Sequence, residues 1–215
     1  MNPGTLRAAL LAPVAAISLT ACGVNSIPTA EEDAKARWAD VQNQYQRRAD
    51  LIPNLVASVQ GAAAQERNVL REVTEARANA TRIQISPEQL RDPEAMRSFS
   101  EAQARLTTAI IPLQRLQEAY PDLKTNQNFL ALQSQLEGTE NRIAIARRDY
   151  NGAVQAYNTE IRTFPSLIAA RFVYGAQPLQ PFNATSPGAD RAPTITFDPV
   201  TGATPRPGAP APAAS

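Results

Sequence analysis

The strongest constraint on the fold is a series of large apolar residues spaced seven apart near the C-terminal half of the chain. The series consists of Phe129, Leu136, Ile143, Tyr150, Tyr157 and Phe164. A spacing of seven places side chains along one narrow stripe of an α-helix, and such a stripe is buried only when another helix packs along it. No segment alternates convincingly with the period of two that is typical of a strand. The pattern therefore predicts an all-α protein whose helices pack lengthwise.

Two earlier segments carry stripes of the same kind. Residues 30–85 hold two series that together form one stripe. The first is Trp38, Tyr45, Ile52 and Val59, and the second is Val41, Arg48, Leu55, Ala62 and Val69. A third stripe is made by Phe99, Ala102, Leu106, Ala109, Leu113, Leu116 and Tyr120. Long helices joined by short turns bury such stripes by packing antiparallel. We therefore expect an antiparallel up-and-down bundle of three long helices, with a short closing helix after Pro165.

Pro53 interrupts the first of these helices and leaves two alternatives open. A proline inside a helix removes a backbone hydrogen bond and disfavours helical geometry at the preceding residue. The chain either kinks there or turns back in a tight hairpin, with Asp50 capping a new helix. Because the seven-residue phase continues unchanged across Pro53, we favour one long helix that is kinked and ends near Ile85. Counted as two, its halves would make four helices in all.

Several short patterns predict where helices begin. Thr29 followed by Glu32 has the form of a capping box, so the first helix is expected to start at Thr29. Ser86-Pro87 and Asp92-Pro93 each place a capping residue before a proline at the first helical position. The folded domain is then expected to span residues 30–172.

The N-terminal segment has the parts of a bacterial lipoprotein signal. Arg7 precedes an apolar stretch over residues 8–19, and Leu19-Thr20-Ala21-Cys22 resembles a lipobox, in which the cysteine is acylated and becomes the first mature residue. The apolar stretch is shorter than the roughly 20 residues that a membrane-spanning helix needs. We expect residues 1–21 to be removed, residues 22–29 to form a tether, and Cys22 to anchor the protein in a membrane, since two or more acyl chains bind stably.

The C-terminal segment has a different composition from the rest of the chain. Half of the 18 prolines lie after residue 177, among alanine, glycine and threonine. Such a segment holds too little apolar surface to offset the entropy of ordering it. Residues 173–215 are therefore expected to form a disordered tail.

Composition argues against most chemistry. The chain has no histidine and one cysteine, Cys22, so the usual catalytic triads and most zinc sites cannot be built. No glycine-rich phosphate loop is present in the sequence. With 21 basic and 20 acidic residues, the charge gives no reason to expect nucleic-acid binding. Paired carboxylates remain available, but no pair stands out. We expect a protein that is not an enzyme and binds no metal or cofactor.

Two groups of sequence words resemble the LemA family. The first runs from Trp38 to Val56 and includes the words WADVQ (38–42) and RRADLIPNLV (47–56). The second includes Tyr120-Pro121-Asp122, Leu136 to Ile143 (LEGTENRI) and the repeated Tyr-Asn pairs at 150–151 and 157–158. The resemblance covers residues 30–172. It implies a helical bundle held at a membrane outside the cytoplasm, in a family most of whose members have no assigned activity and some of whose relatives are linked to organelle organisation. The family usually has an N-terminal transmembrane helix, which a lipid anchor replaces here.

A candidate polar cluster lies along these stripes and consists of Arg48, Glu137, Glu140 and Asn141. We expect Arg48 to pair with Glu137 or Glu140 across the bundle and so to fix helix register, as polar residues in helical cores can. The alternative is a site for a ligand or partner. The repeated Tyr-Asn pairs indicate an aromatic seam with satisfied amides rather than a cofactor site.

The functional expectation is a lipid-anchored scaffold that binds another protein of the bacterial cell envelope. The alternative is an envelope sensor that binds a small ligand or lipid in a cleft between helices. The bundle is expected on the periplasmic side in a Gram-negative cell. Gly23, rather than an aspartate, follows the cysteine and favours the outer membrane.

Overall fold

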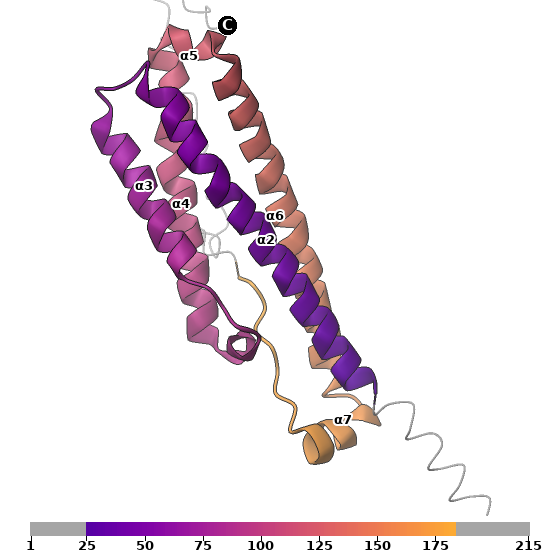
Figure 1. The fold of residues 1–215 in the computed structure, drawn as a ribbon. Coiled ribbons are helices and arrows are strands. Elements are labelled where there is room, and N and C mark those ends of the chain that lie inside the picture. Colours follow the sequence, from indigo (N-terminus) through magenta and orange to yellow (C-terminus); the bar gives the residue numbers. More distant parts are fainter. Residues whose placement is uncertain (1–24, 184–215) are drawn as a thin grey trace, which may run out of the picture.

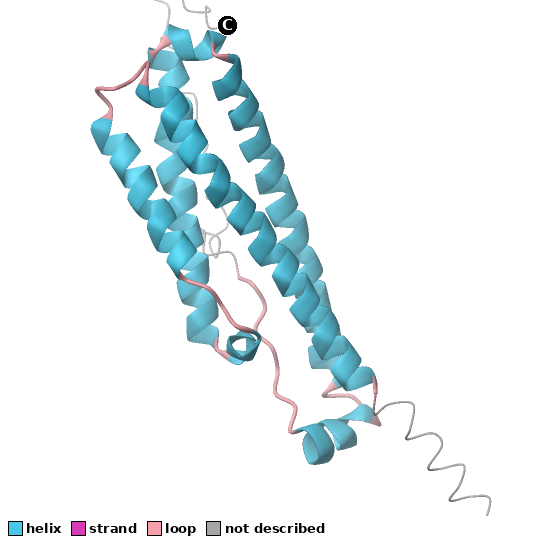
Figure 2. Ribbon diagram, viewed as in Figure 1, coloured by secondary structure: helices cyan, strands magenta, loops and turns pink. Residues whose placement is uncertain are grey.

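The computed structural model describes residues 25–183 and shows an elongated bundle of four long helices (Figure 1). The long helices are α2 (Ser26–Gln60), α3 (Arg67–Arg82), α4 (Pro93–Ala119) and α6 (Gln127–Glu160). The short elements are η1 (Pro87–Arg91), α5 (Pro121–Thr125), α7 (Ser166–Ala169) and η2 (Ala170–Tyr174). Residues 25–183 contain no β-strand (Figure 2), which confirms the all-α prediction. None of the helices in this range is both long and apolar enough to cross a membrane.

The four long helices form two closely packed pairs. α2 packs along α6, and α3 packs along α4 (Figure 1). Ser26 at the start of α2 contacts Glu160 at the end of α6, and Arg48 contacts Glu140 further along both helices, so the α2–α6 pair is antiparallel. The apolar stripes predicted an antiparallel bundle, and the structure confirms it.

The first helix starts earlier than its predicted cap. α2 begins at Ser26, and the hydroxyl of Thr29 lies inside its first turn, where it donates to the carbonyl of Asn25 at 2.8 Å. Pro28 is tolerated because the first N–H groups of a helix have no partner within it. Burial of Ile27 beneath this turn adds a reason for the early start. Residues 26–29 therefore belong to α2 rather than to the predicted tether.

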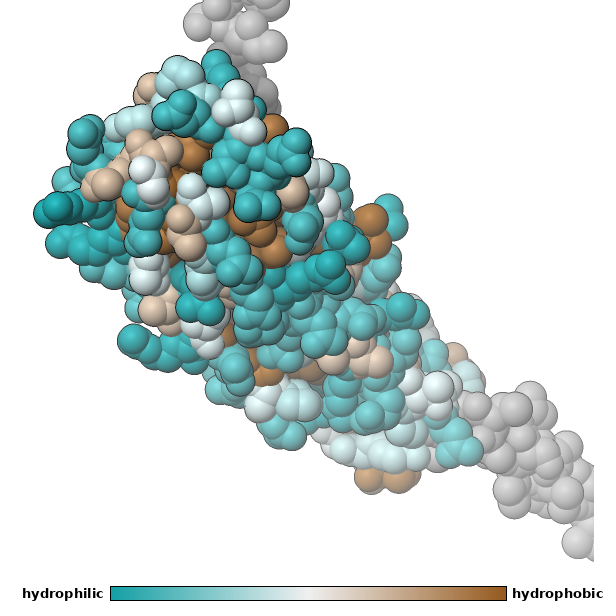
Figure 3. Space-filling view, turned by 45° about the horizontal axis from the view of Figure 1, so that its top comes forward, coloured by the Kyte–Doolittle hydropathy of each residue, from teal (hydrophilic) through white to brown (hydrophobic). Residues whose placement is uncertain are grey.

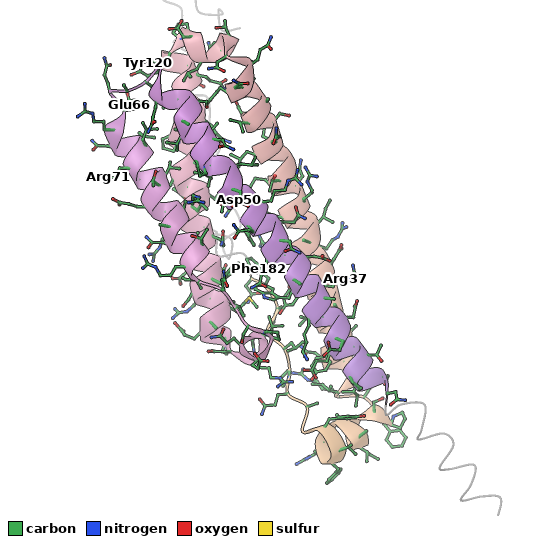
Figure 4. All side chains as sticks on the ribbon, in the orientation of Figure 1. Arg37, Asp50, Glu66, Arg71, Tyr120 and Phe182 are labelled. Atoms are coloured by element: carbon green, nitrogen blue, oxygen red, sulfur yellow. The ribbon has the colours of Figure 1, made fainter. Side chains whose placement is uncertain are left out.

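The prediction of one helix from residue 30 to Ile85 is wrong, and so is the alternative of a tight hairpin at Pro53 with Asp50 capping a new helix. α2 continues through Pro53, and the chain turns back over residues 61–66. Gly61, a poor helix former, follows the last residue of α2, and Ala63 is buried within the turn. At the far side of the turn, the hydroxyl of Tyr120 donates to Glu66 at 3.2 Å. Figure 4 shows these two residues at the same end of the bundle.

A side chain from α3 compensates for the proline inside α2. Pro53 has no N–H, so the carbonyl of Ala49, four residues earlier, lacks its helical partner. The guanidinium of Arg77 donates to this carbonyl through Nε at 2.7 Å. This bond makes the defect in α2 a docking point for α3. It also explains how the helix passes through Pro53 without breaking.

The predicted stripes form the core, although Ala62, Val69 and Tyr120 are only partly buried and Phe164 is exposed. The core is divided into two buried clusters, one towards each end of the bundle. The stripe residues of α2 and α6 are buried in these clusters as far as Tyr157, whereas Phe164 is 80% exposed. The prediction for Phe164 is wrong because α6 ends at Glu160, before the next step of seven.

The predicted boundary of the folded domain, at residue 172, is also too early. Residues 176–183, which we call the strap, return along the bundle after η2 (Figure 1). Leu179 and Phe182 of the strap are buried in the core. The remainder of the predicted tail, residues 184–215, and the predicted anchor Cys22 lie outside the described residues.

Replacement of Pro53 tests the link between α2 and α3. Pro53→Ala should stabilise the protein by about 1–2 kcal/mol. The free-energy cost of a proline inside a helix is larger than the stabilisation that the same proline gives by restricting the unfolded chain. Arg77→Leu should destabilise the wild-type background by about 1–2 kcal/mol through loss of the bond to Ala49. In the Pro53→Ala background the Arg77→Leu effect should largely disappear, because the helix again supplies a donor. Urea unfolding measures all four proteins.

Pro112→Ala is the matched control for this cycle. α4 also runs through its proline, and the carbonyl that Pro112 leaves without a helical partner belongs to the exposed residue Thr108. The effects of Pro112→Ala and Arg77→Leu should therefore add. If the Arg77→Leu effect is equally large with and without Pro53, the bond to Ala49 is not what joins the two helices.

Candidate functional site

The most deeply buried charge in the described residues is the guanidinium of Arg48, whose side chain is 1% exposed. Its Nη1 donates to Glu140 Oε1 and to Thr107 Oγ1, each at 2.9 Å. Its Nη2 donates to Gln103 Oε1 at 2.6 Å and to the carbonyl of Gln103 at 3.3 Å. The guanidinium also lies over the ring of Tyr45, at 5.0 Å from its centroid. A single side chain of α2 thus binds both α4 and α6.

These contacts extend to the fourth long helix. The side-chain amide of Gln103, which is buried, donates to the carbonyl of Ala80 in α3 at 3.3 Å. We call Arg48, Gln103, Thr107 and Glu140 the polar layer. It lies between the two apolar clusters, one of which includes Tyr45 and the other Ile52 on either side of Arg48. The layer therefore joins all four long helices at one level of the bundle.

The structure brings together two of the four residues in the predicted cluster. Arg48 pairs with Glu140, one of the two acids proposed for it. Glu137 is exposed and accepts a 3.4 Å hydrogen bond from Gln133, while Asn141 lies on the exposed side of α6. The side chain of Glu140 is 41% exposed. The guanidinium of Arg48 therefore depends on its hydrogen-bond partners, whereas the carboxylate of Glu140 retains contact with water.

Gln103 and Thr107 complete the site, and sequence reasoning missed both. Gln103 lies between Phe99 and Leu106 at helical spacing, so it occupies a core position of α4. A polar residue at a core position of α4 is as unusual as Arg48 on the stripe of α2, so it could have been noticed in the same way. The stripe assignment passed over it because the neighbouring Ala102 also fits the pattern.

A second polar assembly is built on α6 from the repeated Tyr-Asn pairs. Asn158 donates to the carbonyl of Leu179 at 2.9 Å and accepts from its N–H at 2.9 Å. Asn151 pairs in the same way with Phe182, at 3.0 and 2.7 Å. Each amide thereby satisfies both backbone groups of one strap residue, as a neighbouring strand would. The amides are satisfied, as the seam interpretation expected, but by a segment that had been assigned to the tail.

The tyrosines bind strap residues next to these pairs. Tyr157 donates to the carbonyl of Gln177 at 3.2 Å, and Tyr150 donates to that of Gln180 at 2.8 Å. Burial raises the pKa of Tyr150 and of Tyr157, so both hydroxyls keep the proton that they donate. We call these four α6 residues and their strap partners the ladder. Because residue 179 meets 158 and residue 182 meets 151, the strap runs antiparallel to α6.

The ladder matches two different helical repeats. Gln177-Pro178-Leu179 and Gln180-Pro181-Phe182 are successive triplets of the same kind. In each, the third residue is buried and the proline, which has no N–H to satisfy, is exposed. A period of three is that of polyproline II, which rises about 9.3 Å per three residues. Seven residues of α-helix rise about 10.5 Å, so one triplet spans nearly one step between the Tyr-Asn pairs.

The ladder positions Phe182 inside an aromatic cluster. The ring of Phe182 lies 6.3 Å from that of Phe99 and 6.2 Å from that of Tyr45, and the guanidinium of Arg147 lies 4.2 Å from its centroid. Figure 4 shows Phe182 reaching the interior between α2 and α4. The strap therefore supplies part of the core at this end of the bundle.

The comparison with protein families agrees with the sequence words and this architecture. The model of the LemA family matches residues 37–197. The chain belongs to the LemA family. The match includes the polar layer and the strap as well as the helices, so the strap lies within the part of the chain that defines this LemA protein.

Three curated relatives are magnetosome proteins. The chain is 27% identical over 172 residues to Magnetosome protein MamQ 1 and to Magnetosome protein MamQ 2 of Paramagnetospirillum magneticum, covering 73% of this chain and 63% of each relative. It is 26% identical to Magnetosome protein MamQ of Magnetospirillum gryphiswaldense, over 74% of this chain and 65% of that protein. The LemA protein thus spans less than two thirds of the length of these relatives.

Substitution of Arg48 tests the polar layer. Arg48→Met should lower the free energy of unfolding by about 2–4 kcal/mol, because it leaves the buried oxygens of Gln103 without their donor. Glu140→Gln should cost less, about 1 kcal/mol, since the half-exposed acid is solvated and glutamine can still accept. Arg142→Met on the exposed face of α6 is the control. An Arg48→Met protein as stable as wild type but unable to bind a partner would assign Arg48 to a binding surface.

Truncation and an asparagine substitution together test the ladder. Ending the chain at Asn183 should leave the melting temperature nearly unchanged, whereas ending it at Gly175 should cost about 3–5 kcal/mol through exposure of the pockets for Leu179 and Phe182. Asn158→Ala should destabilise the longer protein by about 1–3 kcal/mol and the shorter one hardly at all. Asn141→Ala is the matched control. Equal effects of Asn158→Ala in both lengths would mean that its amide does not act through the strap.

Proposed function

We propose that this LemA protein is a membrane-anchored, non-catalytic interaction protein of the bacterial cell envelope. The observation that carries the proposal is that the hydrogen bonds of both internal polar assemblies are made within the chain itself, with Arg48 Nε the one nitrogen of that guanidinium without a partner among the described residues. The guanidinium of Arg48 is directed at three side chains of the bundle, and the amides of Asn151 and Asn158 at the strap. These groups stabilise a rod of helices rather than facing a substrate. The exposed faces of the rod are then the surfaces on which a partner binds.

The sequence supplies the anchor in this proposal. α2 begins at Ser26, only a few residues after Cys22, so an acylated cysteine would hold the end of the bundle close to the lipid surface. The bundle would lie outside the cytoplasm, on the periplasmic side in a Gram-negative cell, with Gly23 favouring the outer membrane. The naming of three relatives as magnetosome proteins supports a role in assembling a larger cellular structure.

A groove between α3 and α4 is the candidate location for the alternative function, the binding of a small ligand or lipid. The groove has a volume of about 890 Å³. Its lining combines alanines with acidic and basic side chains: Ala76, Ala102, Ala104 and Ala109, Glu72, Glu75 and Glu101, and Arg82 and Arg105. A mixed lining of this kind suits a polar or zwitterionic ligand less well than a partner helix, because few convergent donors fix an orientation.

The experiment combines lipid labelling with site-specific crosslinking in the native bacterium. Wild type and Cys22→Ala are labelled with an alkyne fatty acid, and a photo-crosslinking amino acid replaces Arg71 on α3 or Arg37 on α2. Figure 4 shows both positions on the outside of the bundle. We expect the label on wild type only. We expect a reproducible protein adduct from one of the two faces, which weakens when Cys22→Ala releases the protein from its membrane.

Each part of the proposal has its own contrary result. Mature wild-type protein with an unmodified Cys22 would contradict the anchor. A crosslinked lipid or small molecule at Arg71, without a protein adduct at either face, would favour the ligand-binding function. A chemical reaction catalysed by purified wild type and abolished by substitutions in the α3–α4 groove would contradict the non-catalytic role.

A further inference from the structure

Exposed apolar side chains gather at one end of the bundle. Nine large hydrophobic side chains are exposed among residues 25–183, and six of them lie between residues 164 and 174. We call these six the apolar tip: Phe164, Leu167, Ile168, Phe172, Val173 and Tyr174. Phe164 and Phe172 are each 80% exposed. Elsewhere the visible surface is mainly hydrophilic, with apolar residues visible in a few places (Figure 3). A large exposed apolar patch of this kind marks a surface that contacts a membrane or another protein.

The tip lies at the end of the bundle where α2 begins. The carboxylate of Glu160, at the end of α6, accepts a hydrogen bond from Ser26 at 2.6 Å and another from Ser166 at the start of α7. These bonds hold the pKa of Glu160 below its usual value, so the carboxylate remains charged and keeps both serines at neutral pH. Figure 1 shows α7 beside the first turn of α2. The tip and the beginning of α2 are therefore tied to the same side chain.

The segment between Cys22 and α2 is short enough to keep the tip close to a membrane that holds Cys22. Three residues lie between Cys22 and Ser26, and even a fully extended chain spans only about 14 Å over the four steps that join them. An acyl group on Cys22 would therefore hold the tip within reach of the lipid headgroups. This step rests on the proposed lipid anchor.

The charge of the tip suits an anionic lipid surface. Residues 161–183 contain two arginines, Arg162 and Arg171, and no acidic residue. Both arginines are exposed; Arg162 precedes the apolar side chains along the chain, and Arg171 lies among them. Arginine binds phosphate through its planar fork and can keep its charge at the headgroups while its stem lies against apolar surface. Phenylalanine and tyrosine side chains suit the interfacial region of a bilayer.

We propose that the apolar tip inserts into the headgroup region of the membrane that carries the anchor, and so forms a second membrane contact besides the acyl chains. Phe164 and Phe172 enter the interface, and Arg162 and Arg171 contact lipid phosphates. Two contacts at one end restrict the tilt of the bundle, whereas attachment at Cys22 alone would leave the tilt free. The opposite end, with the turn between α2 and α3, then points away from the membrane.

The test uses the polypeptide from residue 22 onward with Cys22→Ala, which retains the whole bundle but carries no acyl chain. Flotation with vesicles of phosphatidylethanolamine and a minor fraction of phosphatidylglycerol measures binding. We expect this protein to float with the vesicles. The added pair Phe164→Ser and Phe172→Ser should reduce the bound fraction by at least about tenfold, because two exposed rings no longer enter the lipid. The pair Ile111→Ser and Leu130→Ser, at exposed apolar positions outside the tip, is the matched control.

The outcomes separate the tip from the anchor and from other partners. The protein tested has no lipid, so failure of Cys22 acylation in cells leaves this result unchanged, and failure of flotation leaves the acylation result unchanged. Absence of vesicle binding, or equal loss in the tip and control pairs, overturns the proposal. A dimer in solution that only the Phe164→Ser and Phe172→Ser pair dissociates assigns the tip to a second copy instead. Circular dichroism melting checks that both pairs remain folded.

Discussion

The buried guanidinium of Arg48 is the constraint on which the rest of the bundle depends. Removing a cation from water is costly, and the cost is met only where several acceptors converge on it. Here the acceptors come from α4 and α6, and Gln103 extends the contact to α3. Apolar stripes alone would permit helices to slide by one turn, since leucine can replace leucine. A charge that fits at one level opposes such sliding, so we infer that the layer helps to fix the register while the two clusters beside it supply the burial.

The sequence predicted most of the helices, because their stripes repeat over many turns. It failed at the turn over residues 61–66, since Ala62 and Val69 continue the phase of α2 even though the chain reverses between them. α3 has a buried stripe of its own, made by Leu70, Val73 and Ala80, and this stripe happens to fall in step with that of α2. A regular spacing therefore shows that helices are present, but it does not show that they are one helix.

The candidate site was predicted in part for a similar reason. Arg48 stood out because a charge on an apolar stripe is unusual, and its two possible acids lay beside the stripe of the helix that faces it. The strap was missed because its prolines and glutamines have the composition of a disordered segment. Its hydrogen bonds go to side chains of Asn151 and Asn158, far away in the sequence, and a local pattern carries no sign of them. The Tyr-Asn repeat on α6 could be recognised in the sequence, whereas the strap that binds it could not.

The direction of the strap determines how the bundle responds to force. The first strap residues pair with Asn158 near the end of α6, and the last with Asn151, further into the bundle. A pull on the chain after Asn183, resisted at the start of α2, acts from opposite ends of the strap and so loads the strap along its length. The pairs at Asn151 and Asn158 are then sheared together instead of being peeled away one at a time. Tension from the C-terminal side would therefore be resisted by the ladder and passed on to α6.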